Sequence, residues 1–186
     1  GKLVGDFTMS RLGPERMQLT ASYAAQAFHM RWFEDHMPES GVEVRNISDD
    51  RIGFQIAGPN ARELLSRVTR ADVSNETFKF LDVREIEVGM LTAIVCRVSY
   101  TGGLGYEIYV GREHQVALYE ALVKAGADLG LRPFGMRAMM SLRLEKSFGA
   151  WMREYKPDYT AAETGLDRFI NFQKEDFIGR DAAVIE

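Results

Sequence analysis

The stretch VREIEVGMLTAIVCRVSYTGGLGYEIYV, residues 83–110, decides the fold class. Val83 to Val88 and Leu91 to Val98 flank Gly89, and this pattern predicts a β-hairpin with the glycine in its turn. Gly105 to Val110 follows as a further strand after a glycine-rich turn. Three short strands with no helix between them favour an antiparallel sheet.

Helical patterns lie on both sides of this stretch. Predicted helices span Tyr23–Met37, Ala61–Val68, Glu113–Leu129 and Met136–Phe148. Ser22 is the expected N-cap of the first helix. Further strand candidates flank Gly13-Pro14 and Asp49-Asp50, where Val42–Ile47 and Ile52–Ile56 alternate. The expected inner face of the 113–129 helix is Val116, Tyr119, Leu122 and Val123. Because strands and helices mix without regular βαβ alternation, we predict an α+β fold with antiparallel or mixed sheets and packed helices.

Composition excludes several classes of protein. The net charge is -4 and no Lys/Arg run is present, which argues against a nucleic-acid partner. No apolar stretch approaches the ~20 residues of a membrane span. Cys96 is the single cysteine, so neither an internal disulfide nor a cysteine-rich zinc site is expected. The opening Gly1 to Asp6 has no signal peptide and reads as the interior of a longer protein, which predicts a fragment.

Metal, nucleotide and hydrolase sites find little support. His29 and His36 are seven residues apart and are interpreted as surface or packing residues, so no metal site is predicted. Gly102 to Gly105 precedes a strand, whereas a phosphate-binding loop should follow a strand and open a helix. No Gly-x-Ser-x-Gly elbow is present. Three carboxylates, Asp6, Glu107 and Glu145, lie in apolar surroundings, but periodicity alone does not separate a catalytic from a structural role.

Five motifs in order resemble the glycine-cleavage T-protein (aminomethyltransferase) family. Arg97 to Ile108 resembles its R-x-x-Y-T-G-E-x-G-(F/Y)-E signature, with Gly103 in place of the usual Glu. Ser141 to Lys146 resembles its S-L-R-L-E segment. The later P-x-E-A-G-L and D-F-(I/L)-G-(K/R) positions are matched by Glu163–Leu166 and Asp176–Arg180. Gly5 to Thr8 and Ala25 to Phe33 look most like the folate-binding portion of dimethylglycine and sarcosine dehydrogenases.

The resemblance implies roles for six residues. Asp6 would be the catalytic carboxylate near the reacting folate nitrogens, and Glu107 would accept hydrogen bonds from the pterin. Tyr100 and Tyr106 would line the folate cavity, where aromatic faces pack on the flat pterin. Arg143 would orient the folate or a carboxylate with its bidentate donor fork. Trp151 falls where the family has an aromatic residue near the folate.

The resemblance also implies the reaction and the domain plan. Tetrahydrofolate would capture an iminium or formaldehyde equivalent and give methylenetetrahydrofolate. FAD would be needed only in a missing upstream domain, expected in cis, and the other ligand would be a small amine. Residues 15–130 would form a ferredoxin-like, βαβ-rich layer, with residues 1–14 and 131–186 in a neighbouring layer and the C-terminal barrel absent. The expected location is cytoplasmic, or the mitochondrial matrix in a eukaryote.

Several alternatives stay open at this point. One is the glycine-cleavage T-protein itself, which takes its aminomethyl group from a lipoyl carrier protein. Another is a non-catalytic folate-binding module like the tRNA-modification relatives, although Cys96 does not fit their K-x-C-(Y/F)-x-G-Q-E motif. A sulfonium demethylase and a structural remnant that binds nothing are the others.

Overall fold

The computed structural model describes residues 1–185, and its contacts cluster into two compact units. Unit 1 comprises Gly1–Thr8, Thr20–Val44 and Gly149–Glu186, and unit 2 comprises Met9–Leu19 and Arg45–Phe148. No helix within residues 1–185 is both long and apolar enough to cross a membrane. The predicted α+β class with antiparallel strands is confirmed.

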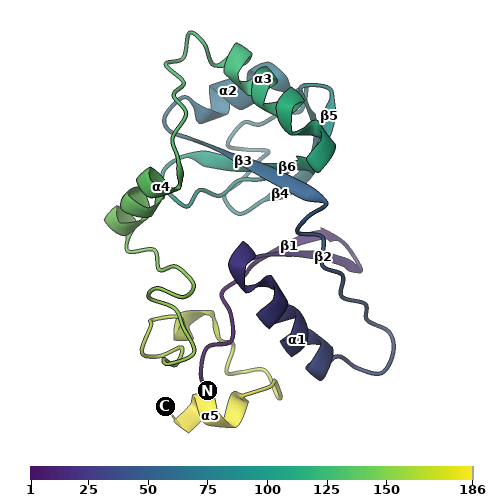
Figure 1. Cartoon of the computed structure of the whole chain (residues 1–186), viewed down its shortest axis with the longest axis vertical. Helices are drawn as coiled ribbons and strands as arrows, with labels where there is room; N and C mark the ends of the chain where they lie inside the picture. The colour runs from purple at the N-terminus through teal and green to yellow at the C-terminus, as the bar shows by residue number, and fades with distance from the viewer. Residues whose placement is uncertain (186) are drawn as a thin grey trace. The chain divides into compact units, whose positions relative to one another are not determined.

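Unit 2 is built on a four-stranded antiparallel sheet with the spatial order β3-β6-β5-β4. The strands are β3 (Arg51–Ala57), β4 (Val83–Val88), β5 (Leu91–Cys96) and β6 (Gly105–Gly111). The helices α2 (Ala61–Val68) and α3 (Gln115–Ala125) cover the same face of this sheet (Figure 1). The predicted hairpin about Gly89 and the predicted helix over 61–68 are therefore confirmed.

The core of unit 2 lies between the sheet and these two helices. Leu65, Leu118 and Leu122 from the helices pack with Ile108 and Val110 of β6. Alternation along β6 explains this arrangement, since every second side chain points to the helices. The other residues of β6 point to the opposite face, which we call the second face of the sheet.

The predicted inner face of α3 is wrong for three of its four residues. Val116, Tyr119 and Val123 are exposed, whereas Leu118 and Leu122 are buried. Apolar residues occur on every side of this helix, so its pattern does not define one stripe and tertiary packing selects the leucines. A 3-10 turn, Arg112–His114, leads into α3, and α4 (Met136–Leu142) continues into a second 3-10 turn at Arg143–Lys146.

The turn at Gly13-Pro14 is confirmed as a hairpin, with β1 (Thr8–Gly13) paired to β2 (Arg16–Thr20). In unit 1, a 3-10 turn at Tyr23–Ala25 precedes α1 (Gln26–His36). Ser22 is the N-cap residue of this 3-10 turn, as predicted, although its side chain makes no capping hydrogen bond. The predicted strand over 42–47 is also wrong, because these residues form no ladder and β3 pairs with β6 instead. Unit 1 ends with a 3-10 turn at Asp167–Phe169 and α5 (Arg180–Ile185).

Candidate functional site

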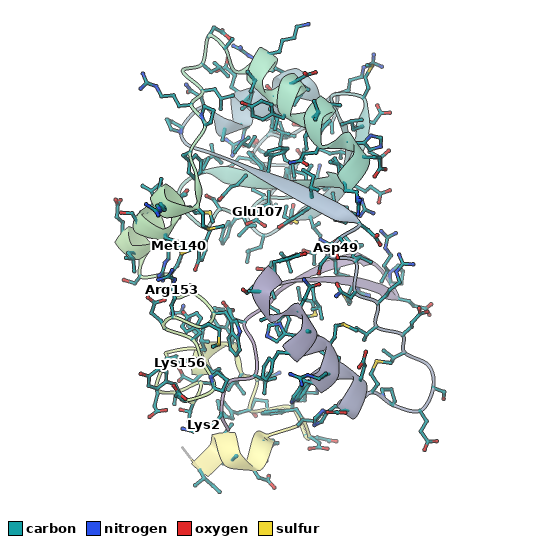
Figure 2. All side chains as sticks on the ribbon, viewed as in Figure 1. Lys2, Asp49, Glu107, Met140, Arg153 and Lys156 are labelled. Carbon is teal, nitrogen blue, oxygen red and sulfur yellow. The ribbon has the colours of Figure 1, made fainter. Side chains whose placement is uncertain are left out.

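Glu107 lies half-buried on the second face of the sheet in unit 2 (Figure 2). The hydroxyl group of Tyr109, two residues along β6, donates a hydrogen bond to its Oε2 at 2.5 Å. The sheet register pairs Glu107 with Gln55 on β3 and with Cys96 on β5. Burial raises the pKa of the Glu107 carboxyl above its ordinary value of 4.5, and the Tyr109 hydrogen bond partly opposes this rise.

The loop before β6 is held by its own polar side chains. Gln55 Nε2 donates to Ser99 Oγ at 2.8 Å, and this hydroxyl lies 2.7 Å from Thr101 Oγ1. Gly102 has a φ of +73° and lies against the aliphatic stem of Lys146, where a Cβ would meet Cγ at 2.3 Å. Gly103, where the family has Glu, faces open space. The loop is therefore fixed by residues that precede the substituted position.

Tyr100, one of the two predicted cavity-lining tyrosines, lies in this loop. Its ring stacks on Phe148 with centroids 6.2 Å apart, and the residue is half-buried. Tyr106 is fully buried in the core, packs on Phe78 and accepts a hydrogen bond from Arg62 Nε at 3.3 Å. This position does not fit a cavity wall shared with Glu107, because strand alternation turns Tyr106 to the opposite face.

Arg143 is buried, with 3% of its surface exposed. Its Nη1 donates to the carbonyl oxygen of Phe148 at 2.7 Å, across a turn in which Ser147 has a φ of +56°. Part of the guanidinium fork therefore holds the segment that carries Phe148, the ring on which Tyr100 stacks.

Asp6 lies in unit 1 and is an exposed residue. Desolvation by the surrounding protein atoms nevertheless raises the pKa of its carboxyl above 3.8. The next residue, Phe7, anchors the segment, since its ring contacts His29 and Phe33 at centroid distances of 4.6 and 5.7 Å. A carboxyl group with a raised pKa is a stronger base than an ordinary aspartate.

Trp151 belongs to the same aromatic cluster of unit 1. Its ring contacts those of Phe28 at 6.3 Å and His29 at 5.4 Å. His29 is 4% exposed, and its Nε2 has no hydrogen-bond partner within residues 1–185. Burial lowers the pKa of this imidazole, and a hydrogen bond with the backbone of Val4 partly opposes the change. His29 thus links Trp151 to the segment that carries Asp6, and its packing role is confirmed.

Sequence reasoning missed Tyr109 and Gln55. Period-two alternation would have placed Tyr109 beside Glu107, because residues i and i+2 of a strand share a face. Gln55 lies 52 positions from Glu107, and no local pattern predicts their pairing. Among the residues that the structure describes, no group of three or more His, Cys, Asp or Glu side chains is suited to hold a metal ion.

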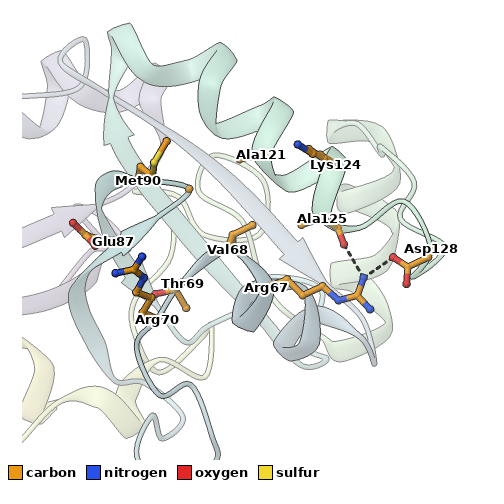
Figure 3. A pocket seen from close by; sticks show the side chains of 11 residues that line it. Arg67, Val68, Thr69, Arg70, Glu87, Met90, Ala121, Lys124, Ala125 and Asp128 are labelled. Atoms are coloured by element: carbon orange, nitrogen blue, oxygen red, sulfur yellow. Dashed lines mark hydrogen bonds and ion pairs between the residues drawn. The ribbon is translucent and has the colours of Figure 1, made fainter.

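A groove with a volume of about 680 Å³ lies elsewhere on unit 2, beside α2, α3 and the β4–β5 turn (Figure 3). Across it, Arg67 Nη1 donates to the carbonyl of Ala125 at 3.0 Å and to Asp128 Oδ1 at 2.5 Å. None of the six predicted site residues, all of them described, lines this groove. The groove is therefore distinct from the positions that the sequence predicts for the functional site.

Comparison with known families decides how this arrangement is interpreted. Residues 1–174 match the GCVT N-terminal domain. The chain belongs to this family. Glu107, on β6 directly after the glycine-rich loop, lies within the part of the chain that matches this family.

The relatives of this GCVT N-terminal domain include dehydrogenases and aminomethyltransferases. Mitochondrial dimethylglycine dehydrogenase of Homo sapiens is 38% identical over 185 residues, which cover 98% of this chain and 21% of the human protein. An aminomethyltransferase of a Thermoanaerobacter species is 32% identical over 182 residues, covering 98% of this chain and 49% of that protein. The chain thus spans about a fifth to a half of the length of these curated relatives.

One solved structure supports the fold. Heterotetrameric sarcosine oxidase from Corynebacterium sp. U-96 matches with a TM-score of 0.58 and 20% sequence identity, over 73% of this chain and 66% of that one. At this identity the likeness concerns the fold alone.

Proposed function

We propose that this GCVT N-terminal domain is the tetrahydrofolate-binding, one-carbon transfer portion of an enzyme like dimethylglycine or sarcosine dehydrogenase. The single observation that carries the proposal is Glu107, a half-buried carboxylate on the second face of the sheet, within the family motif. The relatives named dimethylglycine dehydrogenase support the dehydrogenase branch.

The Glu107 carboxylate suits the edge of a pterin ring. Oε2 accepts the Tyr109 hydroxyl, while Oε1 accepts no hydrogen bond from residues 1–185. A carboxylate is an acceptor-only group, and a pterin edge presents adjacent N–H donors. In the proposal, Glu107 accepts these donors, and Tyr100 offers an aromatic face for the flat ring system. Arg143 and Trp151 stay proposed folate-binding residues, the first through the turn that positions Phe148.

Asp6 is the proposed proton acceptor. Tetrahydrofolate, when bound, would supply the two nitrogen atoms that take up the one-carbon unit from an iminium or formaldehyde equivalent, giving methylenetetrahydrofolate and releasing the donor amine or water. The attacking nitrogen loses a proton, which Asp6 takes up as a general base. Its raised pKa favours this role, because a base is more effective as its pKa approaches the operating pH. Oxidation of the amine is assigned to an FAD domain of the intact protein, which the proposal places in cis.

The direct test is calorimetric titration of the full-length protein with a stable reduced folate, 5-formyltetrahydrofolate. We expect saturable binding that Glu107→Ala weakens at least tenfold, since a hydrogen bond to a charged group contributes about 1.5–3 kcal/mol. Glu87→Ala, which removes an exposed carboxylate from β4 of the same sheet, is the matched control and should bind like the parent. Absence of binding by the folded parent protein, or equal binding by the Glu107 variant, would contradict the proposal.

An aminomethyltransferase of the glycine-cleavage type is the second candidate. The observation in its favour is that relatives with this name match 98% of the chain at 32% identity. Turnover separates the two functions: methylenetetrahydrofolate formed from dimethylglycine or sarcosine supports the first, and formation only from an aminomethylated lipoyl carrier protein supports the second. Folate binding without either reaction would indicate a non-catalytic folate-binding module.

A further inference from the structure

The position of the Glu107 carboxylate depends on a neighbour that the family motif does not include. Tyr109 follows two residues later on β6, so the two side chains point to the same face of the sheet. The Tyr109 hydroxyl donates to Oε2 of Glu107 at 2.5 Å, the short distance expected for a hydrogen bond to a charged acceptor. This bond fixes one carboxylate oxygen and leaves Oε1 for other donors.

The Tyr109 ring in turn lies on a glycine of the adjacent strand. The register pairs Gly53 on β3 with Tyr109, and a Cβ at Gly53 would lie 2.7 Å from Cε1 and 2.8 Å from Cδ1 of the tyrosine. Gly53 is not among the residues with positive φ, so its missing side chain, and not backbone freedom, is what this position requires. Glycine inside a strand weakens the strand, which is consistent with a position where another group approaches closely.

We propose that Tyr109, seated on Gly53, is a positioning residue that holds the Glu107 carboxylate in the orientation needed to receive the N–H donors of the ligand. The proposal rests on the proposed folate function and deepens it. Tyr109 contacts no reacting atom in this proposal and acts only through Glu107.

The groups that face Glu107 support this role. The sheet register places two residues beside Glu107. Gln55 of β3 is uncharged, and Cys96 of β5 has a thiol pKa that is raised by burial. Ser10 of β1 lies 3.7 Å from the Cys96 sulfur and is also neutral. Of the groups described, the Tyr109 hydroxyl alone donates to the carboxylate, and it opposes the effect of burial on the Glu107 pKa.

The test measures the pKa of Glu107 by carbon-13 NMR of its carboxyl group in the full-length, folate-free protein, with the signal assigned by its loss in Glu107→Gln. Tyr109→Phe keeps the ring over Gly53 and removes only the hydroxyl, so we expect the Glu107 pKa to rise. Affinity for 5-formyltetrahydrofolate should fall about tenfold near neutral pH, because the carboxylate is no longer held in the orientation that receives the ligand. The pH below which binding is lost should also move upward.

Gly53→Ala is the second variant, because its Cβ displaces the ring without changing Tyr109; it should shift the Glu107 pKa and the affinity in the same directions. Tyr119→Phe, on α3 and half-exposed, is the matched control and should change neither. An unchanged Glu107 pKa in Tyr109→Phe overturns the inference, whether or not folate binds. The inference is also overturned if Tyr109→Phe shifts the Glu107 pKa but binds the folate as tightly as the parent, provided that Glu107→Ala loses binding. Failure of the parent protein to bind the folate refutes the proposed function instead, and the NMR titration still decides whether Tyr109 holds Glu107.

Discussion

Asp6, the proposed base, illustrates how a single ionisable residue can oppose stability. Desolvation raises the pKa of this carboxyl above 3.8 in the folded protein. A raised folded-state pKa favours the folded state below the unfolded pKa, and this contribution is lost as the pH rises through the folded pKa. Near pH 7 the ionised Asp6 therefore destabilises the folded state relative to a neutral side chain of the same shape.

Asp6→Asn should consequently have two opposite effects. We expect the free energy of unfolding to increase near pH 7, with the gain shrinking as the pH falls through the folded-state pKa and lost well below 3.8, where the parent carboxyl is protonated in both states. Formation of methylenetetrahydrofolate should slow about 100-fold or more, the usual contribution of a general base, while folate affinity stays close to that of the parent. Urea unfolding at several pH values and turnover assays measure the two effects.

Asp35→Asn, at an exposed position of α1, is the control for both measurements. Equal turnover by the Asp6 variant and the parent would refute the assignment of Asp6 as the base.

At the scale of the element, the β4–β5 hairpin contains a local conflict. Gly89 and Met90 form its two-residue turn and both have positive φ, +58° and +68°, as a type I′ turn requires. Methionine is a poor residue for this conformation, and Met90 is 95% exposed. Met90→Asn should therefore stabilise the protein by about 1 kcal/mol, measured by urea unfolding.

Gly89→Ala provides the opposite case in the same turn. It should destabilise the protein, because its φ is positive and its Cβ would lie 2.9 Å from that of Ala121 on α3. A loss of stability in Met90→Asn would show that the exposed methionine contributes more than its backbone conformation costs.

Local signals account for the elements that the sequence predicts well. The hairpin around Gly89 and the helix α2 depend on alternation, glycine placement and helical spacing over fewer than twenty residues. The strand over 42–47 and the inner face of α3 were wrong for a different reason. The partner of β3 is β6, more than 40 residues away, and α3 has apolar side chains on several sides, so long-range packing decides both outcomes.

In the candidate site, too, local signals predict some residues and long-range packing decides others. The motif around Tyr100 and the family resemblance predict Glu107, and the structure gives it a half-buried position with a perturbed pKa. The contact between Gly53 and Tyr109 could not be predicted, because it requires the register between β3 and β6. Tyr106 matches the motif as well as Glu107 does, but it is the adjacent residue on β6, so its side chain points to the opposite face and lies in the core.

At the scale of the whole molecule, the two compact units carry different natural probes. Both tryptophans, Trp32 and Trp151, lie in unit 1, whereas the single cysteine, Cys96, is buried in unit 2. Tryptophan fluorescence therefore reports on the unfolding of unit 1. Reaction of Cys96 with a thiol reagent reports on the opening of unit 2, because a buried thiol with a raised pKa reacts only when it is exposed.

Leu65→Ala should separate these two signals. Leu65 is fully buried in the core of unit 2, so its truncation should reduce the stability of that unit by about 2–5 kcal/mol. Because contacts cluster within each unit, we expect the urea midpoint for Cys96 labelling to fall while the midpoint for tryptophan fluorescence stays close to the parent value. Val116→Ala, at an exposed position of α3, should move neither midpoint. An equal fall of both midpoints in Leu65→Ala would mean that the chain unfolds as one cooperative body, since probes of a single two-state transition must coincide.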